Sequence, residues 1–355
     1  MCTVTFFRHR DCKHMWAAIT EPCGPGMGFH TCRSFGDTGV TKDRPPVYLT
    51  RGRSCPRCGT EAVDGNVVRL VRRMGWGLKI GVGPDEEDWG VDVSCMLPTP
   101  DTSHVPYERV YEPSEDSFLL LDTLSSDGER LFLRKQLSSS AHHPRLVVEV
   151  GTGSGVILAF VHAHAEAILG SRHVFTSGVD VSLVACRATV ATVTKADDDE
   201  GVAVEGREGG GNGRGGGFYL GACVADLVSP WRDGSVDLLI FNPPYVPTPS
   251  LPLPPNGAEE TKPSFENDSH LLELAYAGGR DGMQTTDRFI DDLPRVLSPT
   301  GCAYILLCAQ NKPSLVMERI RAFGSAWRAE AVASSGKTAG WEKLQVVRVW
   351  REPLP

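Results

Sequence analysis

A short apolar run that leads directly into a glycine-rich loop constrains this chain more than any other feature. Residues 146–150 read Leu-Val-Val-Glu-Val, which is typical of a strand buried inside a parallel sheet. Residues 151–155 read Gly-Thr-Gly-Ser-Gly, and the apolar segment 156–169 after them is typical of a helix. This order opens a nucleotide-binding α/β sheet, because the glycines let the backbone pass close beneath a ligand and the helix N-terminus offers free N–H groups.

Acidic residues at the ends of three candidate strands indicate which ligand the loop takes. Glu149 precedes the loop, where a carboxylate would repel a pyrophosphate but suits the ammonium group of an amino acid. The candidate strands 174–180 and 218–226 end in Asp180, placed for ribose hydroxyls, and Asp226, placed for an adenine amino group. The set fits S-adenosylmethionine better than NAD or ATP. The alternative is that each acid caps a following helix.

A fourth candidate strand, 236–240, leads into Asn242, Pro243, Pro244 and Tyr245. The prolines have no N–H group to donate, so the loop cannot continue a ladder and is stiff. Carbonyls of Asn242 and Pro243 and the Asn242 side-chain oxygen can hold a planar amide or amine nitrogen, with Tyr245 stacked on it. Holding that nitrogen in line with a sulfonium methyl is catalysis by positioning, without a strong general base. A proline-rich turn is the simpler alternative, which the glycine loop and the three acids disfavour.

The glycine loop followed by Asn-Pro-Pro-Tyr resembles class I N-methyltransferases that modify exocyclic or amide nitrogens. Segments 96–124 and 275–307 resemble the eukaryotic branch of the HemK-like release-factor glutamine methyltransferases, and the similarity covers about 96–355. The resemblance implies an α/β, Rossmann-like fold with a seven-stranded, mostly parallel sheet whose last strand is reversed. It also implies S-adenosylmethionine-dependent N5-methylation of the glutamine in the GGQ motif of the eukaryotic class I release factor. The implied partner is a small zinc-binding activator subunit that forms a heterodimer and covers an apolar surface.

The same resemblance assigns roles to residues. The catalytic positions would be Asn242, Pro243, Pro244 and Tyr245. The cofactor-binding positions would be Ser117, Glu149, Gly151, Thr152, Gly153, Gly155, Asp180, Asp226, Leu227 and Asn242. Relatives often have Thr at the position of Ser117. Glu112 and Asp116 fit either the mouth of the pocket or the cap of a helix.

Residues 1–95 differ from the rest of the chain. They contain seven of the eleven cysteines and carry a net charge of +2, against −10 for residues 96–355. Cys55 and Cys58 have the spacing of two thiolate ligands of one zinc ion. The candidates for a second pair match no common finger: Cys12, His14, Cys23, His30 and Cys32. A zinc site, unligated thiols and a redox or disulfide role all stay open, as does whether this extension belongs to the working enzyme or reflects an upstream fusion or a mistaken start.

Two loops and one turn complete the prediction for 96–355. Residues 195–217 are rich in glycine and charge, which predicts a flexible insert without a catalytic role. The proline-rich stretch 247–269 follows the Asn-Pro-Pro-Tyr loop, so it either helps to admit the substrate or is a plain linker. Gly278, Gly279 and Gly282 predict a tight structural turn before a helix.

Charge separates the remaining classes of function. The net charge of −8 argues against a general nucleic-acid binder, because phosphate binding needs an excess of Lys and Arg. An N6-adenine methyltransferase on DNA or RNA and a protein lysine methyltransferase stay as alternatives, and the acidic domain weakens the first. An inert binding protein with this fold would show damaged motifs, whereas both motifs are intact. We expect a cytoplasmic protein, with the nucleus as a second compartment, and no membrane-spanning helix.

Overall fold

The computed structural model describes residues 97–138, 143–205, 217–254, 264–335 and 343–352, together with the backbone of four short strands near the N-terminus. The chain divides into two compact units, with the boundary between Thr99 and Pro100. Within the described ranges, every helix is too short or too polar to cross a bilayer.

The first unit contains a four-stranded sheet. Its strands are β1 (Thr3–His9), β2 (Met15–Glu21), β3 (Val47–Thr50) and β4 (Leu78–Ile80), in the order β3-β1-β2-β4. β1 pairs antiparallel with β2 and parallel with β3. Cys55 and Cys58 lie outside the described residues, so the zinc site stays a prediction from spacing.

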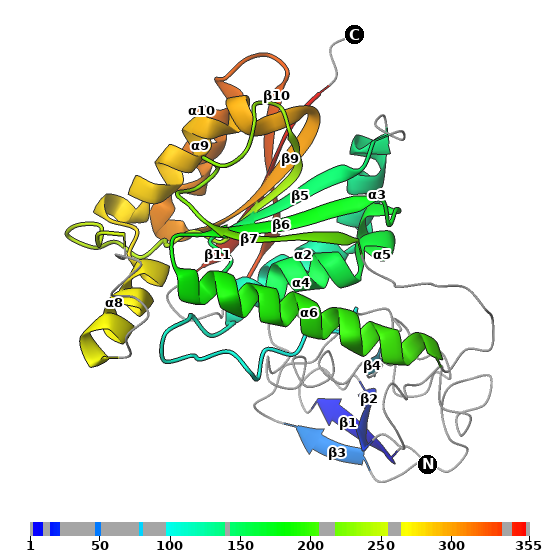
Figure 1. Ribbon diagram of the computed structural model, residues 1–355. Helices are drawn as coiled ribbons and strands as arrows, with labels where there is room; N and C mark the ends of the chain where they lie inside the picture. The colour runs from blue at the N-terminus through cyan, green and yellow to red at the C-terminus, as the bar shows by residue number, and fades with distance from the viewer. Residues whose placement is uncertain are drawn as a thin grey trace. The chain divides into compact units, whose positions relative to one another are not determined.

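The second unit is built on a seven-stranded sheet in the order β10-β11-β9-β8-β5-β6-β7 (Figure 1). The strands are β5 (Arg145–Val150), β6 (Val174–Asp180), β7 (Phe218–Val224), β8 (Val236–Phe241), β9 (Leu297–Cys308), β10 (Trp327–Ser334) and β11 (Leu344–Arg351). β5, β6, β7, β8 and β9 pair in parallel, whereas β11 runs antiparallel to β9 and β10. The predicted fold, mostly parallel with a reversed last strand, is confirmed.

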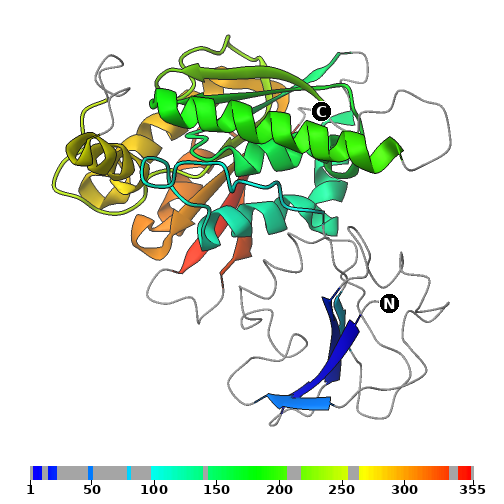
Figure 2. The same ribbon diagram turned by 60° about the horizontal axis from the view of Figure 1, so that its bottom comes forward.

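Helices cover both faces of this sheet. α2 (Glu115–Ser125), α4 (Val156–Ala163) and α6 (Leu183–Glu205) lie on one face, and in Figure 2 the long green helix α6 runs along it. α9 (Gln284–Val296) and α10 (Pro313–Arg321) lie on the other. The remaining helices are α3 (Asp127–Gln136), α5 (Ala165–Leu169) and α8 (Phe265–Tyr276). The predicted helix 156–169 is therefore two helices, α4 and α5, separated at His164.

α9 shows how the sequence pattern builds the core. Phe289, Ile290, Leu293 and Val296 follow the helical repeat and are completely buried against the sheet. Burying such side chains contributes about 1.5–3 kcal/mol each. The helix thus holds the turn before it firmly beside the carboxyl ends of the strands.

α6 extends into the segment that the sequence predicted to be a flexible insert from residue 195. The helix continues to Glu205, and the residues where the insert was predicted to begin have partners elsewhere in the fold. Ala196 is buried, the Lys195 ammonium lies 2.7 Å from an Asp101 carboxylate oxygen, and Asp197 hydrogen-bonds the buried His162 ring at 2.9 Å. The predicted boundary at 195 is therefore too early, and residues 206–216 lie outside the described residues.

The contact between α4 and α6 generates a stability prediction. Gly155 is the N-cap residue of α4 and has a φ of +76°, and an added Cβ would lie 2.6 Å from the Cα of Thr189 in α6. We expect Gly155→Ala to lower the free energy of unfolding by roughly 2–4 kcal/mol, from backbone strain and overpacking together. Gly128→Ala in α3 is the matched control, because a Cβ there meets nothing within 4 Å. Urea unfolding checks both, and equal stabilities for the two variants would contradict the packing account.

Candidate active site

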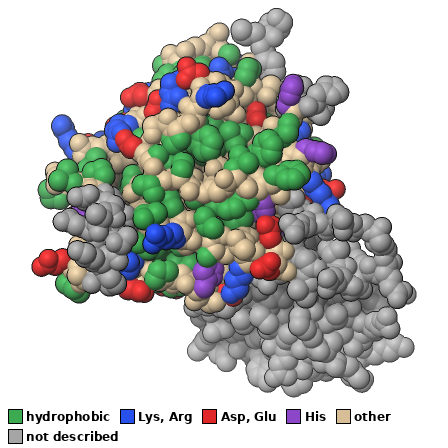
Figure 3. All heavy atoms as spheres, viewed as in Figure 1, with side chains coloured by type: hydrophobic (Ala, Val, Ile, Leu, Met, Phe, Trp, Pro, Cys, Tyr) green, Lys and Arg blue, Asp and Glu red, His purple; other side chains and the backbone are tan. Residues whose placement is uncertain are grey.

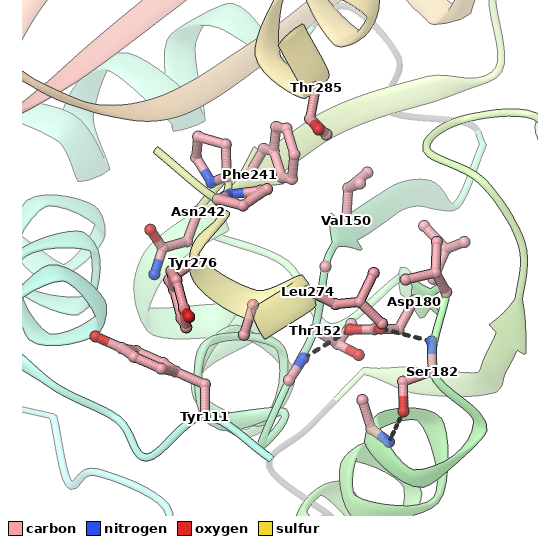
Figure 4. Close-up of a pocket in the computed structure, with 18 of the residues that line it drawn as sticks. Tyr111, Val150, Thr152, Asp180, Ser182, Phe241, Asn242, Leu274, Tyr276 and Thr285 are labelled. Carbon is pink, nitrogen blue, oxygen red and sulfur yellow. Dashed lines mark hydrogen bonds between the residues drawn. The ribbon is translucent and has the colours of Figure 1, made fainter. Parts of the chain in front are cut away.

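A cavity of about 510 Å³ opens at the carboxyl ends of β5, β6 and β8, where open α/β sheets bind their ligands. All but one of the residues predicted for cofactor or substrate line it: Ser117, Glu149, Gly151, Thr152, Gly153, Asp180, Asp226, Leu227, Asn242, Pro243, Pro244 and Tyr245. Gly155 is the exception, since it faces α6 as described above. Figure 4 shows Asn242, Tyr276 and Tyr111 on one side of the cavity, with Asp180 and Ser182 on the other.

The glycine loop is held by the end of the next strand. Gly151 and Gly153 both have positive φ, which L-residues with side chains adopt only at a cost. The Gly153 N–H donates to the Asp180 carboxylate at 3.0 Å, and the other Asp180 oxygen accepts from the Ser182 N–H at 2.9 Å. Asp180 thus supports both the loop and the start of α6 while it lines the cavity. The capping alternative and the ligand-binding alternative are both compatible with this geometry.

Glu149 is an almost completely buried carboxyl beside the loop, 1% exposed. One of its oxygens accepts a hydrogen bond from the Leu158 N–H of α4 at 2.8 Å. Burial raises the pKa of Glu149 well above its usual value, the Leu158 bond opposes that rise, and the charge of Asp180 adds to it. A buried carboxyl of this kind favours a cationic ligand, which would compensate the charge that burial penalises.

Asp226 and Leu227 follow β7 and occupy the same rim of the cavity. Leu227 is buried and has a φ of +49°, an unusual conformation for a residue with a side chain. The Asp226 carboxylate pairs with the guanidinium of Arg288 from α9. Sequence reasoning missed Arg288, because the pairing joins positions 62 residues apart and neither neighbourhood signals the other.

The loop after β8 lines the cavity with the residues Asn242 to Tyr245. In the described part of the protein, the Asn242 side-chain oxygen is buried and has no hydrogen-bond partner. Leaving such an acceptor unpaired is costly, and a donor on a bound ligand would compensate for it. Tyr245 donates from its hydroxyl group to the Asp116 carboxylate at 3.4 Å.

Asp116 belongs to the cavity, whereas Glu112 is exposed and lies outside its lining. Besides Tyr245, the Asp116 carboxylate accepts from the Tyr111 hydroxyl at 3.2 Å and from the Ser117 N–H at 2.6 Å. Nothing in the local pattern had indicated Tyr111.

Another part of the cavity lining is mostly apolar. It combines the part of the proline-rich stretch just after the Asn-Pro-Pro-Tyr loop with α8, through Leu251, Pro252, Leu253, Pro254, Leu271, Leu274 and Tyr276. An ion pair of 2.8 Å between Arg109 and Asp268 ties α8 to the segment before α2. Residues 255–263 lie outside the described residues, so substrate admission by the whole stretch stays a prediction. Among the described residues, no group of His, Cys, Asp or Glu is arranged to hold a metal ion.

Comparison with known proteins identifies the family of this site. The mouse protein Methyltransferase HEMK2 is 30% identical over 259 residues, covering 71% of this chain and 96% of that protein. The eRF1 methyltransferase catalytic subunit mtq2 of Schizosaccharomyces pombe is 30% identical over 263 residues, covering 72% and 96%. This chain belongs to the HEMK2/Mtq2 family of methyltransferases.

A solved structure of a related complex also resembles this member of the HEMK2/Mtq2 family. The solved E. cuniculi Mtq2–Trm112 complex, responsible for methylation of the eRF1 translation termination factor, is 21% identical, with a TM-score of 0.35. The alignment covers 69% of this chain and 99% of that chain. A search of protein-family models found no match.

As a class I methyltransferase, the chain uses S-adenosylmethionine as its methyl donor, and the residues of the cavity fit that group. The glycine loop leaves room for a ligand beside the buried Glu149 carboxyl, which suits an ammonium group. Asn242 lines the same cavity, and among the described residues its buried side-chain oxygen has no hydrogen-bond partner.

The raised pKa of Glu149 predicts how stability without cofactor depends on pH. The folded protein holds the proton of the Glu149 carboxyl more tightly than the unfolded chain does. The resulting contribution to the free energy of unfolding is fully present below the usual pKa of a glutamate, and it is lost as the pH rises through the pKa of Glu149 in the folded protein. We expect Glu149→Gln to remove this loss of stability at higher pH, because glutamine does not ionise. Urea unfolding between pH 5 and 8 should show the variant gaining on the wild type as pH rises. A constant difference between them across that range would contradict the assignment.

Proposed function

We propose that this chain methylates the side-chain amide nitrogen of the glutamine in the GGQ motif of the eukaryotic class I release factor. The observation that carries the proposal is the buried Asn242 side-chain oxygen, which has no hydrogen-bond partner among the described residues. It belongs to a loop that lines the cavity and whose two prolines have no N–H group to donate. An amide NH₂ donates two hydrogen bonds, which the Asn242 side chain and the Pro243 carbonyl can accept. The fission-yeast relative, named an eRF1 methyltransferase catalytic subunit, supports the same substrate.

In this proposal the chain's own residues contribute to the reaction by positioning the amide nitrogen of the substrate. S-adenosylmethionine supplies an electrophilic methyl group when bound. The two acceptors hold the amide nitrogen so that it forms the new N–C bond as the S–C bond breaks, and an N–H proton is released to water. Bringing the reacting atoms together in this way supplies a large part of the rate enhancement. Tyr245, held by Asp116, can stack against the planar amide and exclude other orientations.

The other predicted positions have complementary roles in this proposal. Glu149 receives the ammonium group of the cofactor's amino acid, Asp180 the ribose hydroxyls and Asp226 the adenine amino group, with Leu227 against the ring. Each Asp180 oxygen already accepts one backbone N–H, and a carboxylate oxygen can accept a second donor. Arg288 and the adenine amino group would share the Asp226 carboxylate.

The charges around the cavity favour a protein substrate over an adenine in DNA or RNA. The arginines in the described lining, Arg109 and Arg288, are each paired with an aspartate, Asp268 and Asp226. A nucleic-acid substrate would need cations for its phosphates, which these pairings occupy. The unit around the cavity is also the acidic part of the chain.

We propose that the small zinc-binding activator binds at the edge of the sheet formed by β7. β7 is the end strand of the sheet, and residues 225–235 after it contain turns but no helix. Phe218 and Leu220 are 61% and 57% exposed on the face opposite α6. Figure 3 shows hydrophobic side chains gathered across this region of the surface. Exposed apolar patches beside an open strand edge are typical protein-binding sites.

Zinc at Cys55 and Cys58 is a separate proposal, which rests on their spacing alone. Metal analysis of the purified full chain and of its Cys55→Ser variant tests it.

The substrate proposal predicts the outcome of a labelling experiment. Full-length enzyme, purified with the activator and given methyl-labelled S-adenosylmethionine, should label release factor but not a release factor changed from GGQ to GGA. Asn242→Ala should lower the labelling rate roughly 100-fold or more while cofactor binding partly survives, because positioning is lost. Equal labelling of the GGA form or of an adenine-containing oligonucleotide would overturn the proposal, and full activity of Asn242→Ala would overturn its mechanism.

The partner proposal predicts that one charge on β7 disrupts the complex. Leu220→Glu should strongly reduce recovery of co-expressed activator with the catalytic chain, because the carboxylate would be buried in an apolar contact. Leu131→Glu on α3 is the matched control, since Leu131 is 71% exposed and lies on another part of the unit. Size-exclusion chromatography measures both complexes, and equal recovery with the two variants would place the activator elsewhere.

A further inference from the structure

The stiff loop after β8 is supported by two segments that are distant from it in sequence, the stretch from Tyr276 to Gly282 and the residue Asn311. Val246 donates its N–H to the Tyr276 carbonyl at 2.9 Å and accepts from the Gly278 N–H at 2.8 Å. Thr248 donates its N–H to the Gly279 carbonyl at 3.0 Å. These bonds hold the chain just beyond Tyr245 to the turn that precedes α9.

Asn311 is at the centre of this support. It is 3% exposed, in a short 3-10 helix (Ala309–Asn311) between β9 and α10. Its side-chain NH₂ group faces three carbonyl oxygens, those of Tyr245 at 3.2 Å and of Asp281 and Gly282 at 3.3 Å each. Its side-chain oxygen accepts from the Cys308 N–H at 2.8 Å. One amide therefore joins the end of β9, the turn before α9 and the Asn-Pro-Pro-Tyr loop.

The glycines of the turn allow this close approach. A Cβ on Gly282 would lie far inside van der Waals contact of the Tyr245 carbonyl oxygen, and one on Gly278 would lie 2.5 Å from the Pro244 carbonyl oxygen. Gly282 also has a φ of +68°, which disfavours any side chain. The turn that the sequence predicted to be structural thus has a specific task, which is to support the carbonyls of Pro244 and Tyr245 from behind.

We propose that Asn311 is a positioning residue for methyl transfer. By drawing the Tyr245 carbonyl away from the cavity, it fixes the orientation of the peptide units before it. The Asn242 oxygen and the Pro243 carbonyl are then held where they receive the acceptor nitrogen. Asn311 does not line the cavity and acts only through this loop. The identity of the acceptor rests on the proposed function, whereas the support of the loop does not.

Asn311→Asp tests the proposal, because it keeps the shape of the side chain and its acceptor for Cys308 but replaces the donor. At pH 8 a carboxylate would face three carbonyl oxygens, so the loop should shift and the turnover number for release factor should fall about 100-fold. Cofactor affinity, measured by calorimetry, should stay within twofold. Burial and the surrounding carbonyls raise the pKa of such a carboxyl. As pH falls toward 6, the protonated acid regains a donor and the ratio of variant to wild-type turnover should rise.

Gln310→Glu is the matched control, since it makes the same change of amide to carboxylate at the exposed neighbouring residue. It should keep wild-type turnover at both pH values. Amide hydrogen exchange gives a readout independent of the substrate. The Val246 and Thr248 N–H groups should exchange at least about tenfold faster in Asn311→Asp than in the wild type at pH 8, because their loop has lost its support.

The outcomes separate this inference from the proposed function. Turnover within twofold of wild type, or unchanged exchange at Val246 and Thr248, would overturn the role of Asn311. A loss of turnover that does not vary with pH and that is accompanied by a fall in melting temperature would show that Asn311 is merely structural. That result would overturn the positioning role as well. If the wild type leaves release factor unlabelled, the proposed function is overturned, and the exchange experiment still decides the role of Asn311.

Discussion

Two consecutive prolines after β8 leave the loop beside the cavity with carbonyl oxygens but without two of its N–H donors. The acceptors cannot be satisfied by continuing the sheet, and the Asn242 oxygen is buried without a partner in the described part of the chain. Leaving that acceptor unpaired is costly, and a ligand that donates to it would remove the cost. The rest of the site depends on this arrangement, because an acceptor group is useful for catalysis only if its position is fixed.

The acids at the strand ends serve the fold and the ligand site together. Glu149 accepts from the first turns of α4, and Asp180 accepts from both the glycine loop and the start of α6. These bonds use only part of each carboxylate's capacity to accept. The same groups therefore hold the loop in shape without cofactor and line the cavity. Helix capping and cofactor binding are not exclusive explanations of these residues.

Features that are local in sequence could be predicted, and features that depend on distant contacts could not. The strand, glycine loop and helix around Glu149 and the Asn-Pro-Pro-Tyr loop contain their chemistry within a few residues, so they indicated the fold and the cavity. Asn311, Tyr111 and Arg288 act through partners far along the chain, and no local pattern marks them. The composition of residues 195–205 suggested flexibility, but tertiary contacts of Lys195 and Asp197 favour the helix there.

The most direct test of the account is a crystal structure of the enzyme with S-adenosylhomocysteine and a peptide that contains Gly-Gly-Gln. The account predicts that the glutamine side-chain nitrogen donates to the Asn242 side-chain oxygen and to the Pro243 carbonyl, with hydrogen-bond distances of about 2.9–3.0 Å. The nitrogen should also face the sulfur of the bound product, with Tyr245 against the plane of the amide. A glutamine bound elsewhere, with the Asn242 oxygen paired to a group of the protein itself, would contradict it.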